Sequence, residues 1–421
     1  MQFHHQTGAI PMHKPKTLHE QQPQFKIELV GWMVRICHSL ELTQTQRQRI
    51  ETCYHAVGNW LAEGTHYLLK EATIYPQGSI RLRTTVKPIG QDEFDVDLII
   101  HLPKASQNIS RKVVLQVIKD RLNEHETYKQ LLKELKRGFR VNYAGDYHLD
   151  ITPAIDYHTH PPYGHPVLVP DRDEEWKSSN PKGMANIFEE ASKRQPRYTA
   201  VFRETFDSIT MSQVESLPDE NRLKTPLQQI TQLAKRNRDV WAMSDQGKRL
   251  AEYKPISVLL TTLLMHSYTF CTQEKFSYNS ELDFLLNVIE NMPSFITSGA
   301  DGYHVDNPTV QGENFAEKWN KPGSGQRYAE AFFTWHRDLL SNLNRLAEVY
   351  GEDEFQKQLK ALFGERPVND AANAIRLNVN QQRVNRNIRV SSGGLLLAGG
   401  AGLSTAAHAT VRPNNFWGRH P

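Results

Sequence analysis

The chain has 421 residues, of which 38% are hydrophobic and 23% charged, and its 50 basic and 47 acidic side chains leave a net charge of +3. This composition indicates a two-domain globular protein and excludes a disordered or fibrous chain, while the near balance of charge excludes strong non-specific nucleic-acid binding. The three cysteines show no C-x-x-C spacing and no apolar run approaches the ~18 residues of a membrane span, so we expect neither disulfides, a zinc site nor a membrane helix, and a cytoplasmic location.

The first half of the chain predicts an α/β domain. Residues 1–24 are polar and rich in Pro, Gln and His, which predicts a flexible arm, and helical periodicity follows from Phe25 to about Lys70. The next segments predict four strands and, between the second and third, one helix: strands at 71–76, 94–102, 138–145 and 147–155, and the helix at 110–126. This order predicts a mixed sheet with a helical crossover, in a catalytic domain over residues 25–165.

The second half predicts a mainly α-helical domain over residues 166–367. It begins in a segment, His158 to Lys182, whose prolines, glycines, histidines and acids predict a long loop or linker. Helical periodicity then returns in four segments: 226–241, 254–270, 281–292 and 325–350. Residues 368–421 are rich in Asn, Gln, Gly and Ala, which predicts a loosely ordered tail.

Three aspartates are the candidate catalytic and metal-binding residues. In the strand FDVDLII, Asp95 and Asp97 lie two residues apart and therefore share one face, ~6.6 Å apart along the strand. Like charges held side by side favour a bound cation, and aspartate oxygens are suitable ligands for Mg²⁺. Two Mg²⁺ ions can catalyse phosphoryl transfer, and Mn²⁺ is a possible substitute. Asp150 lies between apolar Leu149 and Ile151 and should face the opposite side from them, as a third ligand. The alternative is that these acids are solvated positions on an edge strand.

A candidate phosphate-binding turn precedes the first two aspartates. In IYPQGSIRLR, a short apolar strand meets Gly78 and Ser79, where glycine permits close backbone approach and serine offers an amide and a hydroxyl. The basic residues Arg81, Arg83 and Lys87 follow, and Gln77 precedes the turn and is a candidate for steadying the acceptor. The alternative is an ordinary turn with a helix cap, but the order of Gly-Ser, D-x-D and a third strand with Asp is much rarer.

These motifs carry a family resemblance. PQGSIRLRTTVKP, EFDVDLII and YHLDIT resemble the polymerase-β-like nucleotidyltransferases, and SNPKG, KTPLQQITQLAKRNRD, KPISVLLTTL and NPTVQGENFAEKW narrow the resemblance to bacterial cyclic-oligonucleotide synthases of anti-phage systems. These are relatives of animal cyclic GMP–AMP synthase and oligoadenylate synthase. The resemblance implies a fold of the class α/β plus all-α, with a polymerase-β-like core and mixed sheet followed by a helical, oligoadenylate-synthase-like domain.

The resemblance also implies substrates and further binding residues. It implies that ATP and a second nucleoside triphosphate are joined into a cyclic di- or trinucleotide with release of pyrophosphate, in anti-phage defence. Two residues of the helical domain, Lys235 and Ser257, are implied to contact triphosphate oxygens, although Lys235 could equally be a solvated residue on a helix. Asn180 and Lys182 are further candidates for lining the cleft.

Two other functions share the same three acids. One is a template-independent nucleotidyltransferase that acts on RNA or protein, and the other is an inactive nucleotide-binding scaffold, against which the intact acids argue. The histidines His158, His160 and His165 lie in a proline-broken segment without the helical spacing of a zinc site, so a surface loop is predicted there.

Overall fold

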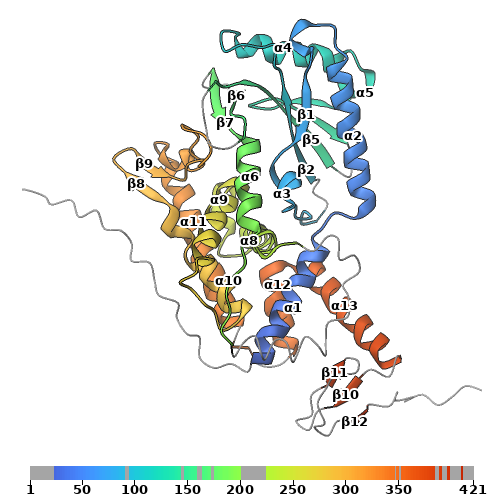
Figure 1. Cartoon of the computed structure of the whole chain (residues 1–421), viewed down its shortest axis with the longest axis vertical. Helices are drawn as coiled ribbons and strands as arrows, with labels where there is room; N and C mark the ends of the chain where they lie inside the picture. Colours follow the sequence, from blue (N-terminus) through green and yellow to red (C-terminus); the bar gives the residue numbers. More distant parts are fainter. Residues whose placement is uncertain are drawn as a thin grey trace, which may run out of the picture.

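Two lobes make up the described part of the chain, a sheet lobe and a helical lobe (Figure 1). The structure, a computed structural model, describes residues 23–90, 94–143, 147–158, 164–171, 175–200, 224–346, 348–349, 352–384, 388–390, 396–398 and 409–410. Nearly all of the arm expected at residues 1–24 lies outside these ranges.

The helical stretch expected from Phe25 to about Lys70 is two helices, α1 (Pro23–Ser39) and α2 (Gln44–Ala62), followed by the short helix η1 (Tyr67–Leu69). The helical stretch is interrupted because Thr43 caps the start of α2. Its side chain accepts the amide N–H of Gln46, whose side chain accepts the amide N–H of Thr43. The two helices serve different cores, since α1 packs in the helical lobe and α2 covers the sheet.

The mixed sheet with a helical crossover is confirmed. Its central strand β2 runs parallel to β5, and every other pairing in this sheet is antiparallel. The order is β1 (Thr73–Pro76), β2 (Phe94–His101), β5 (Tyr147–Asp156), β4 (Phe139–Tyr143) and β3 (Leu132–Glu134). Helices α4 (Arg111–Asn123) and α5 (Glu126–Leu131) make the crossover, and α3 (Gly78–Leu82) follows β1.

One face of this sheet packs on helices, and the opposite face carries the aspartates. Val96 and Leu98 of β2 and Leu149 and Ile151 of β5 are fully buried against α2 and α4. Because side chains alternate along a strand, the residues between them point to the opposite face, toward the helical lobe.

The prediction of a loop from His158 to Lys182 is wrong for its second half. Strands β6 (Val167–Pro170) and β7 (Trp176–Ser179) extend the sheet from β5, and helix α6 (Pro181–Ser192) follows. The four residues of β6 are all buried, which offsets the cost of ordering so short a run between prolines.

The four predicted helices of the second lobe are confirmed. They are α8 (Pro226–Met243), α9 (Ser257–Cys271), α10 (Glu281–Glu290) and α11 (Gly325–Leu346), and fully buried Tyr268, Phe332 and Trp335 lie in their shared core. Smaller elements join them: η3 (Lys248–Tyr253), η4 (Met292–Phe295), η5 (Glu317–Asn320) and the hairpin of β8 (Thr297–Gly299) and β9 (Gly302–His304).

The tail does not begin at residue 368 as a loose segment. After α12 (Glu352–Phe363), helix α13 (Glu365–Val384) continues well past that point and packs on α1, with Val368 and Ala371 buried. A small sheet follows, made of β10 (Ile388–Val390), β11 (Leu396–Ala398) and β12 (Ala409–Thr410). The prediction of a loose tail failed because most residues of this helix are polar and only a few, at regular spacing, are apolar and buried.

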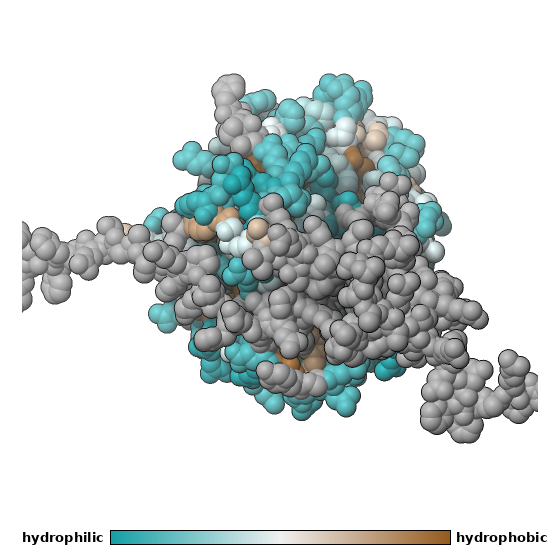
Figure 2. All heavy atoms as spheres, turned by 60° about the horizontal axis from the view of Figure 1, so that its bottom comes forward, coloured by the Kyte–Doolittle hydropathy of each residue, from teal (hydrophilic) through white to brown (hydrophobic). Residues whose placement is uncertain are grey.

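The coloured surface in Figure 2 is mostly hydrophilic, with small scattered hydrophobic areas. Within the described residues, none of the helices combines the length and the apolar composition that crossing a bilayer requires.

Candidate active site

A cavity of about 1280 Å³ lies between the two lobes and contains most of the predicted site residues. This volume exceeds the ~300–1,000 Å³ typical of a pocket for one small ligand. The sheet lobe contributes Gln77, Gly78, Ser79, Asp95, Asp97, Arg140 and His148, and the helical lobe contributes Lys235, Arg238 and Ser257. The structure therefore brings residues from distant parts of the sequence to one cleft.

Strand register places the three aspartates on the same face of the sheet. Asp97 of β2 lies directly opposite Asp150 of β5, and Asp95 lies opposite His148. Residues directly opposite on neighbouring strands share a face, so the acids converge on the side away from the buried core. The orientation expected for Asp150 is confirmed, since its neighbours Leu149 and Ile151 are fully buried.

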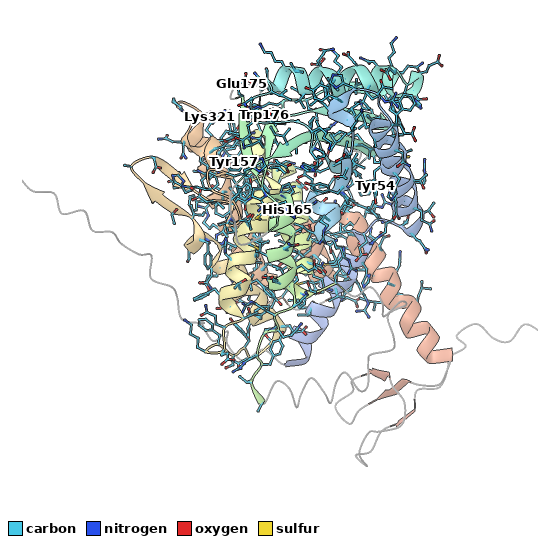
Figure 3. All side chains as sticks on the ribbon, turned by 45° about the horizontal axis from the view of Figure 1, so that its top comes forward. Tyr54, Tyr157, His165, Glu175, Trp176 and Lys321 are labelled. Atoms are coloured by element: carbon cyan, nitrogen blue, oxygen red, sulfur yellow. The ribbon has the colours of Figure 1, made fainter. Side chains whose placement is uncertain are left out.

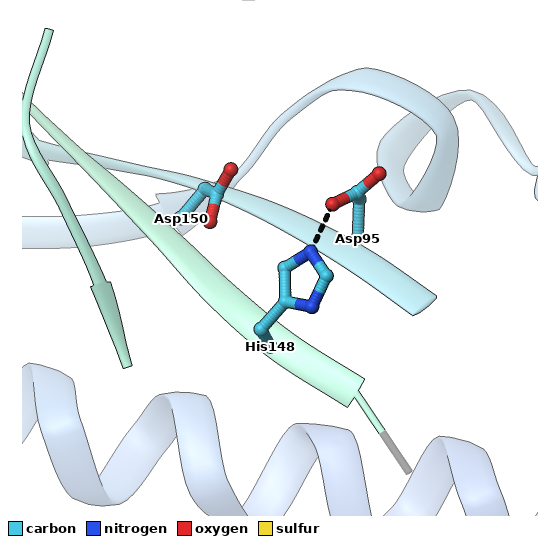
Figure 4. A group of neighbouring side chains, drawn as sticks. All are labelled: Asp95, His148 and Asp150. Atoms are coloured by element: carbon cyan, nitrogen blue, oxygen red, sulfur yellow. Dashed lines mark hydrogen bonds and ion pairs between the residues drawn. The ribbon is translucent and has the colours of Figure 1, made fainter. Parts of the chain in front are cut away.

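Asp95, His148 and Asp150 form a group of neighbouring side chains on this face (Figure 4). One ligand atom from each lies within 4.8 Å of the others, and the imidazole Nε2 of His148 contacts the carboxylate of Asp95. Asp97 does not belong to this group, but the charges of Asp150 and Asp95 affect its pKa. Burial, followed by the negative charge of Asp150 and Asp95, raises the pKa of Asp97 to about 6.

This set of donors fits a divalent cation. Carboxylate oxygens are the ligands that Mg²⁺ and Mn²⁺ prefer, whereas an imidazole suits Zn²⁺, Fe²⁺ and Ni²⁺ better. Burial first, and then the charges of Asp150 and Asp95, raise the pKa of Asp97, so a cation bound beside these acids would favour its charged form.

Arg140 of β4 is bound to two of the acids, a contact that the sequence did not predict. It lies opposite Asp150, donates from Nε and from one terminal nitrogen to the two oxygens of Asp150 at 2.6 and 2.7 Å, and donates to Asp95 at 3.2 Å. Asp150 does not itself line the cavity, whereas Arg140 does. The only available signal was an arginine in a predicted strand, because the antiparallel register of β4 and β5 is not visible in the sequence.

The Gly-Ser turn is fixed against the acids. Gly78 begins the short helix α3 with φ +57°, and a Cβ added there would lie 2.6 Å from Oδ2 of Asp97. The amide N–H of Gln77 donates to the carbonyl of Asp97 at 2.9 Å. Glycine is therefore required here for its left-handed backbone and for the approach of Asp97, in addition to the predicted approach of a phosphate.

Three polar side chains of α8 bind the end of α3 and the residues that follow it. Gln228, Gln232 and Lys235 donate to the carbonyl of Leu82, the carbonyl of Thr85 and the hydroxyl of Thr84, at 3.1, 2.7 and 2.9 Å. Lys235 is consequently buried between the lobes, not solvated. Burial, followed by the charge of Arg238, lowers the pKa of Lys235 to about 7, against the opposing effect of Asp97.

Ser257 begins α9 at the cavity wall and is held by Arg238. The guanidinium of Arg238 donates to Oγ of Ser257 at 3.0 Å and to the carbonyl of Pro255 at 3.1 Å, and it pairs with Asp239. Asp239 also binds Lys254 at 2.9 Å. Arg238 was not among the site residues predicted from the sequence.

Other candidates have structural contacts. Lys87 donates to the carbonyl of Ser39 at 3.1 Å and does not line the cavity, whereas Arg81 lines it and pairs with Glu189. Asn180 caps α6 and donates to the carbonyl of Thr309 at 3.0 Å, and Lys182 lies 4.4 Å from the ring centre of Tyr75.

The predicted histidine loop is partly described. His165 is exposed (Figure 3), and His160 lies outside the described residues. Among the described residues, the group that could hold a metal is the one that contains Asp95 and Asp150, and it does not include His158 or His165.

Comparisons with known proteins agree on one family. Residues 28–191 match the model of the Second Messenger Oligonucleotide or Dinucleotide Synthetase domain. A c-di-GMP synthase of Roseivirga ehrenbergii is 30% identical over 404 residues, which cover 93% of this chain and 98% of that protein.

Two solved structures share the fold. One is the Bradyrhizobium diazoefficiens CD-NTase CdnG in complex with GTP, with a TM-score of 0.60 and 19% identity over 83% of this chain and 99% of that one. The other is Escherichia coli MS115-1 CdnC with ATP, with a TM-score of 0.53 and 12% identity over 80% of this chain and 97% of that one.

Proposed function

The chain belongs to the Second Messenger Oligonucleotide or Dinucleotide Synthetase family and synthesises a cyclic oligonucleotide, and we propose that its product is a cyclic di- or trinucleotide made from nucleoside triphosphates. We propose ATP and a second nucleoside triphosphate as substrates, on the resemblance described above. We propose GTP as the second, because a c-di-GMP synthase of Roseivirga ehrenbergii is similar over nearly the whole chain. A role in anti-phage defence is part of the proposal, on the resemblance described above.

The observation that carries this proposal is the convergence of Asp95, Asp97 and Asp150 on one sheet face beside the Gly-Ser turn. We propose that these acids hold two Mg²⁺ ions. Two such ions activate an attacking hydroxyl and offset the charge of a departing pyrophosphate. Burial and, after it, the charges of Asp150 and Asp95 raise the pKa of Asp97, and a cation at this position would offset these effects.

The remaining site residues bind and orient the nucleotides. We propose that Gly78 and Ser79 carry the triphosphate and that Gln77 steadies the acceptor. Lys235 and Ser257 lie on the opposite wall of the cavity. A bound triphosphate would raise the pKa of Lys235 again, because an anion next to a buried amine favours its charged form.

The reaction balances with these groups. The 2′- or 3′-hydroxyl of the acceptor gives its proton to water, and its oxygen forms a bond to the α-phosphorus of the donor. The bond between that phosphorus and the oxygen bridging to the β-phosphate breaks, and pyrophosphate leaves with the electron pair. The linear product must then turn in the cavity so that its own triphosphate is attacked. A volume of about 1280 Å³ supports the binding of two nucleotides at once.

Replacing Asp97 with Asn tests the proposal. We expect pyrophosphate release to be abolished while the fold is retained, because the change relieves repulsion between acids. Asp245→Asn is a matched control, since Asp245 is an exposed acid paired with Lys248. Release at the wild-type rate from Asp97→Asn would remove Asp97 from the metal site.

The same assay separates the two alternative functions. Pyrophosphate released only after RNA or protein is added would identify a transferase that acts on a macromolecule. Nucleotide binding that needs no divalent cation, with no release, would identify a scaffold.

A further inference from the structure

Arg140 is a basic residue that lies beside the proposed metal ligands, because neighbouring strands align it with two of the acids. Register places Arg140 opposite Asp150, which in turn lies opposite Asp97. Two of its nitrogens bind the two oxygens of Asp150, and one of these nitrogens also reaches Asp95 at 3.2 Å. Such a two-pronged pairing of guanidinium and carboxylate is among the strongest side-chain contacts in proteins.

The same contacts conflict with metal binding. A Mg²⁺ ion demands near-ideal octahedral geometry at ~2.0–2.1 Å and gives up its water reluctantly, so it cannot share carboxylate lone pairs that already point at a guanidinium. An arginine stays charged at any pH that the fold survives, so its charge continues to repel a cation and its hydrogen bonds compete with the cation for the carboxylate oxygens.

We propose that Arg140 is a positioning residue that holds Asp95 and Asp150 together before a metal binds and competes with the ion for Asp150. The protein alone therefore binds divalent cations weakly, and the ions enter together with the triphosphate. This inference rests on the proposed role of the acids as metal ligands.

A triphosphate is a suitable trigger for the release of Arg140. Its phosphate oxygens offer the guanidinium the same two-pronged acceptor geometry as a carboxylate. The side chain of Arg140 lines the cavity and is 25% exposed, so it can turn toward a ligand there, whereas the side chain of Asp150 is 17% exposed. Metal binding and triphosphate binding should then each strengthen the other.

Binding of Mn²⁺ to the protein without nucleotide tests this directly, measured by calorimetry and by the loss of the free-ion electron paramagnetic resonance signal. We expect Arg140→Gln to bind Mn²⁺ about tenfold more tightly than the wild type, because a charged hydrogen-bonding partner no longer competes. With a non-hydrolysable GTP analogue present, we expect the two proteins to differ by much less. Arg140→Gln should also unfold at a lower temperature without metal and recover when Mn²⁺ is added.

Arg81→Gln is the matched control, since Arg81 lines the same cavity but pairs with Glu189. We expect its Mn²⁺ affinity to stay close to that of the wild type. Arg140→Lys keeps the charge but loses the two-pronged pairing, so it should bind Mn²⁺ with intermediate affinity, and it carries the test if Arg140→Gln does not fold.

The outcomes separate this inference from the proposed function. Mn²⁺ affinity without nucleotide that is unchanged or weaker in both Arg140 variants would overturn the competition. If Asp95→Asn and Asp150→Asn bind Mn²⁺ as tightly as the wild type, the acids are not the ligands, and both the metal assignment and the inference fail.

Discussion

A methyl group added at Gly78 tests how closely the Gly-Ser turn and the acids depend on each other. Gly78 has φ +57°, and a Cβ there would lie 2.6 Å from Oδ2 of Asp97, whereas ordinary contact begins at 3.4 Å. The carboxylate must therefore retreat by about 0.8 Å, the difference between these distances. Displacements of ~1 Å in a catalytic site cost about 100-fold in rate. We expect Gly78→Ala to lose about 100-fold in kcat/KM and about 1 kcal/mol of stability from backbone strain.

Gly323→Ala is the control for strain alone, because Gly323 has φ +80° and a Cβ there would meet no atom within 4 Å. The two variants should lose similar stability in thermal unfolding, and pyrophosphate release should fall only in Gly78→Ala. Release by Gly78→Ala at the rate of Gly323→Ala would refute the coupling between the turn and Asp97.

Three further predictions concern the same cleft. Burial and the other acids raise the folded-state pKa of Asp97 from 3.8 to about 6, so the contribution of protonated Asp97 to the stability of the metal-free protein should be present below pH 4 and be lost, by about 3 kcal/mol, as the pH rises through 6. Thermal unfolding of Asp97→Asn across this range should lack this part of the pH dependence, and an unchanged slope would contradict the assignment. Lys235→Met should unfold at a temperature no lower than the wild type at pH 7, because it removes a buried amine. It should also raise the KM for the nucleoside triphosphate about tenfold. An unchanged KM would mean that Lys235 only makes its structural contact with Thr84. Gln232→Ala should cost about 1 kcal/mol in denaturant unfolding, because the carbonyl of Thr85 loses a 2.7 Å hydrogen bond, and no loss would show that this contact does not hold the lobes together.

The sequence predicted those elements whose apolar pattern is long or flanked by turns. The strand that carries Asp95 and Asp97 and the four main helices of the second lobe were predicted correctly. Strands β6 and β7 were missed because each has only four residues and lies among prolines and charges. Helix α13 was missed because its polar composition resembles that of a linker, and its packing on α1 and α12 supplies the apolar stabilisation.

Some features of the candidate site follow from the sequence, and others depend on contacts between distant segments. The orientation of Asp150 was predictable from the alternation of Leu149 and Ile151, which have to be buried. Arg140 was not predictable, because its place depends on the antiparallel register between β4 and β5. The partner of Lys235 was equally hidden, since Thr84 lies 151 residues away in the sequence.

In the proposed reaction, three acids on one sheet face drive the joining of two nucleotides into a ring. The most direct measurement incubates the purified protein with radiolabelled ATP and GTP and Mg²⁺, treats the products with phosphatase, and compares the wild type with Asp95→Asn and Asp150→Asn. We expect a phosphatase-resistant product from the wild type and none from either variant. Labelled products that phosphatase degrades, or a resistant product from either variant at the wild-type rate, would contradict the account.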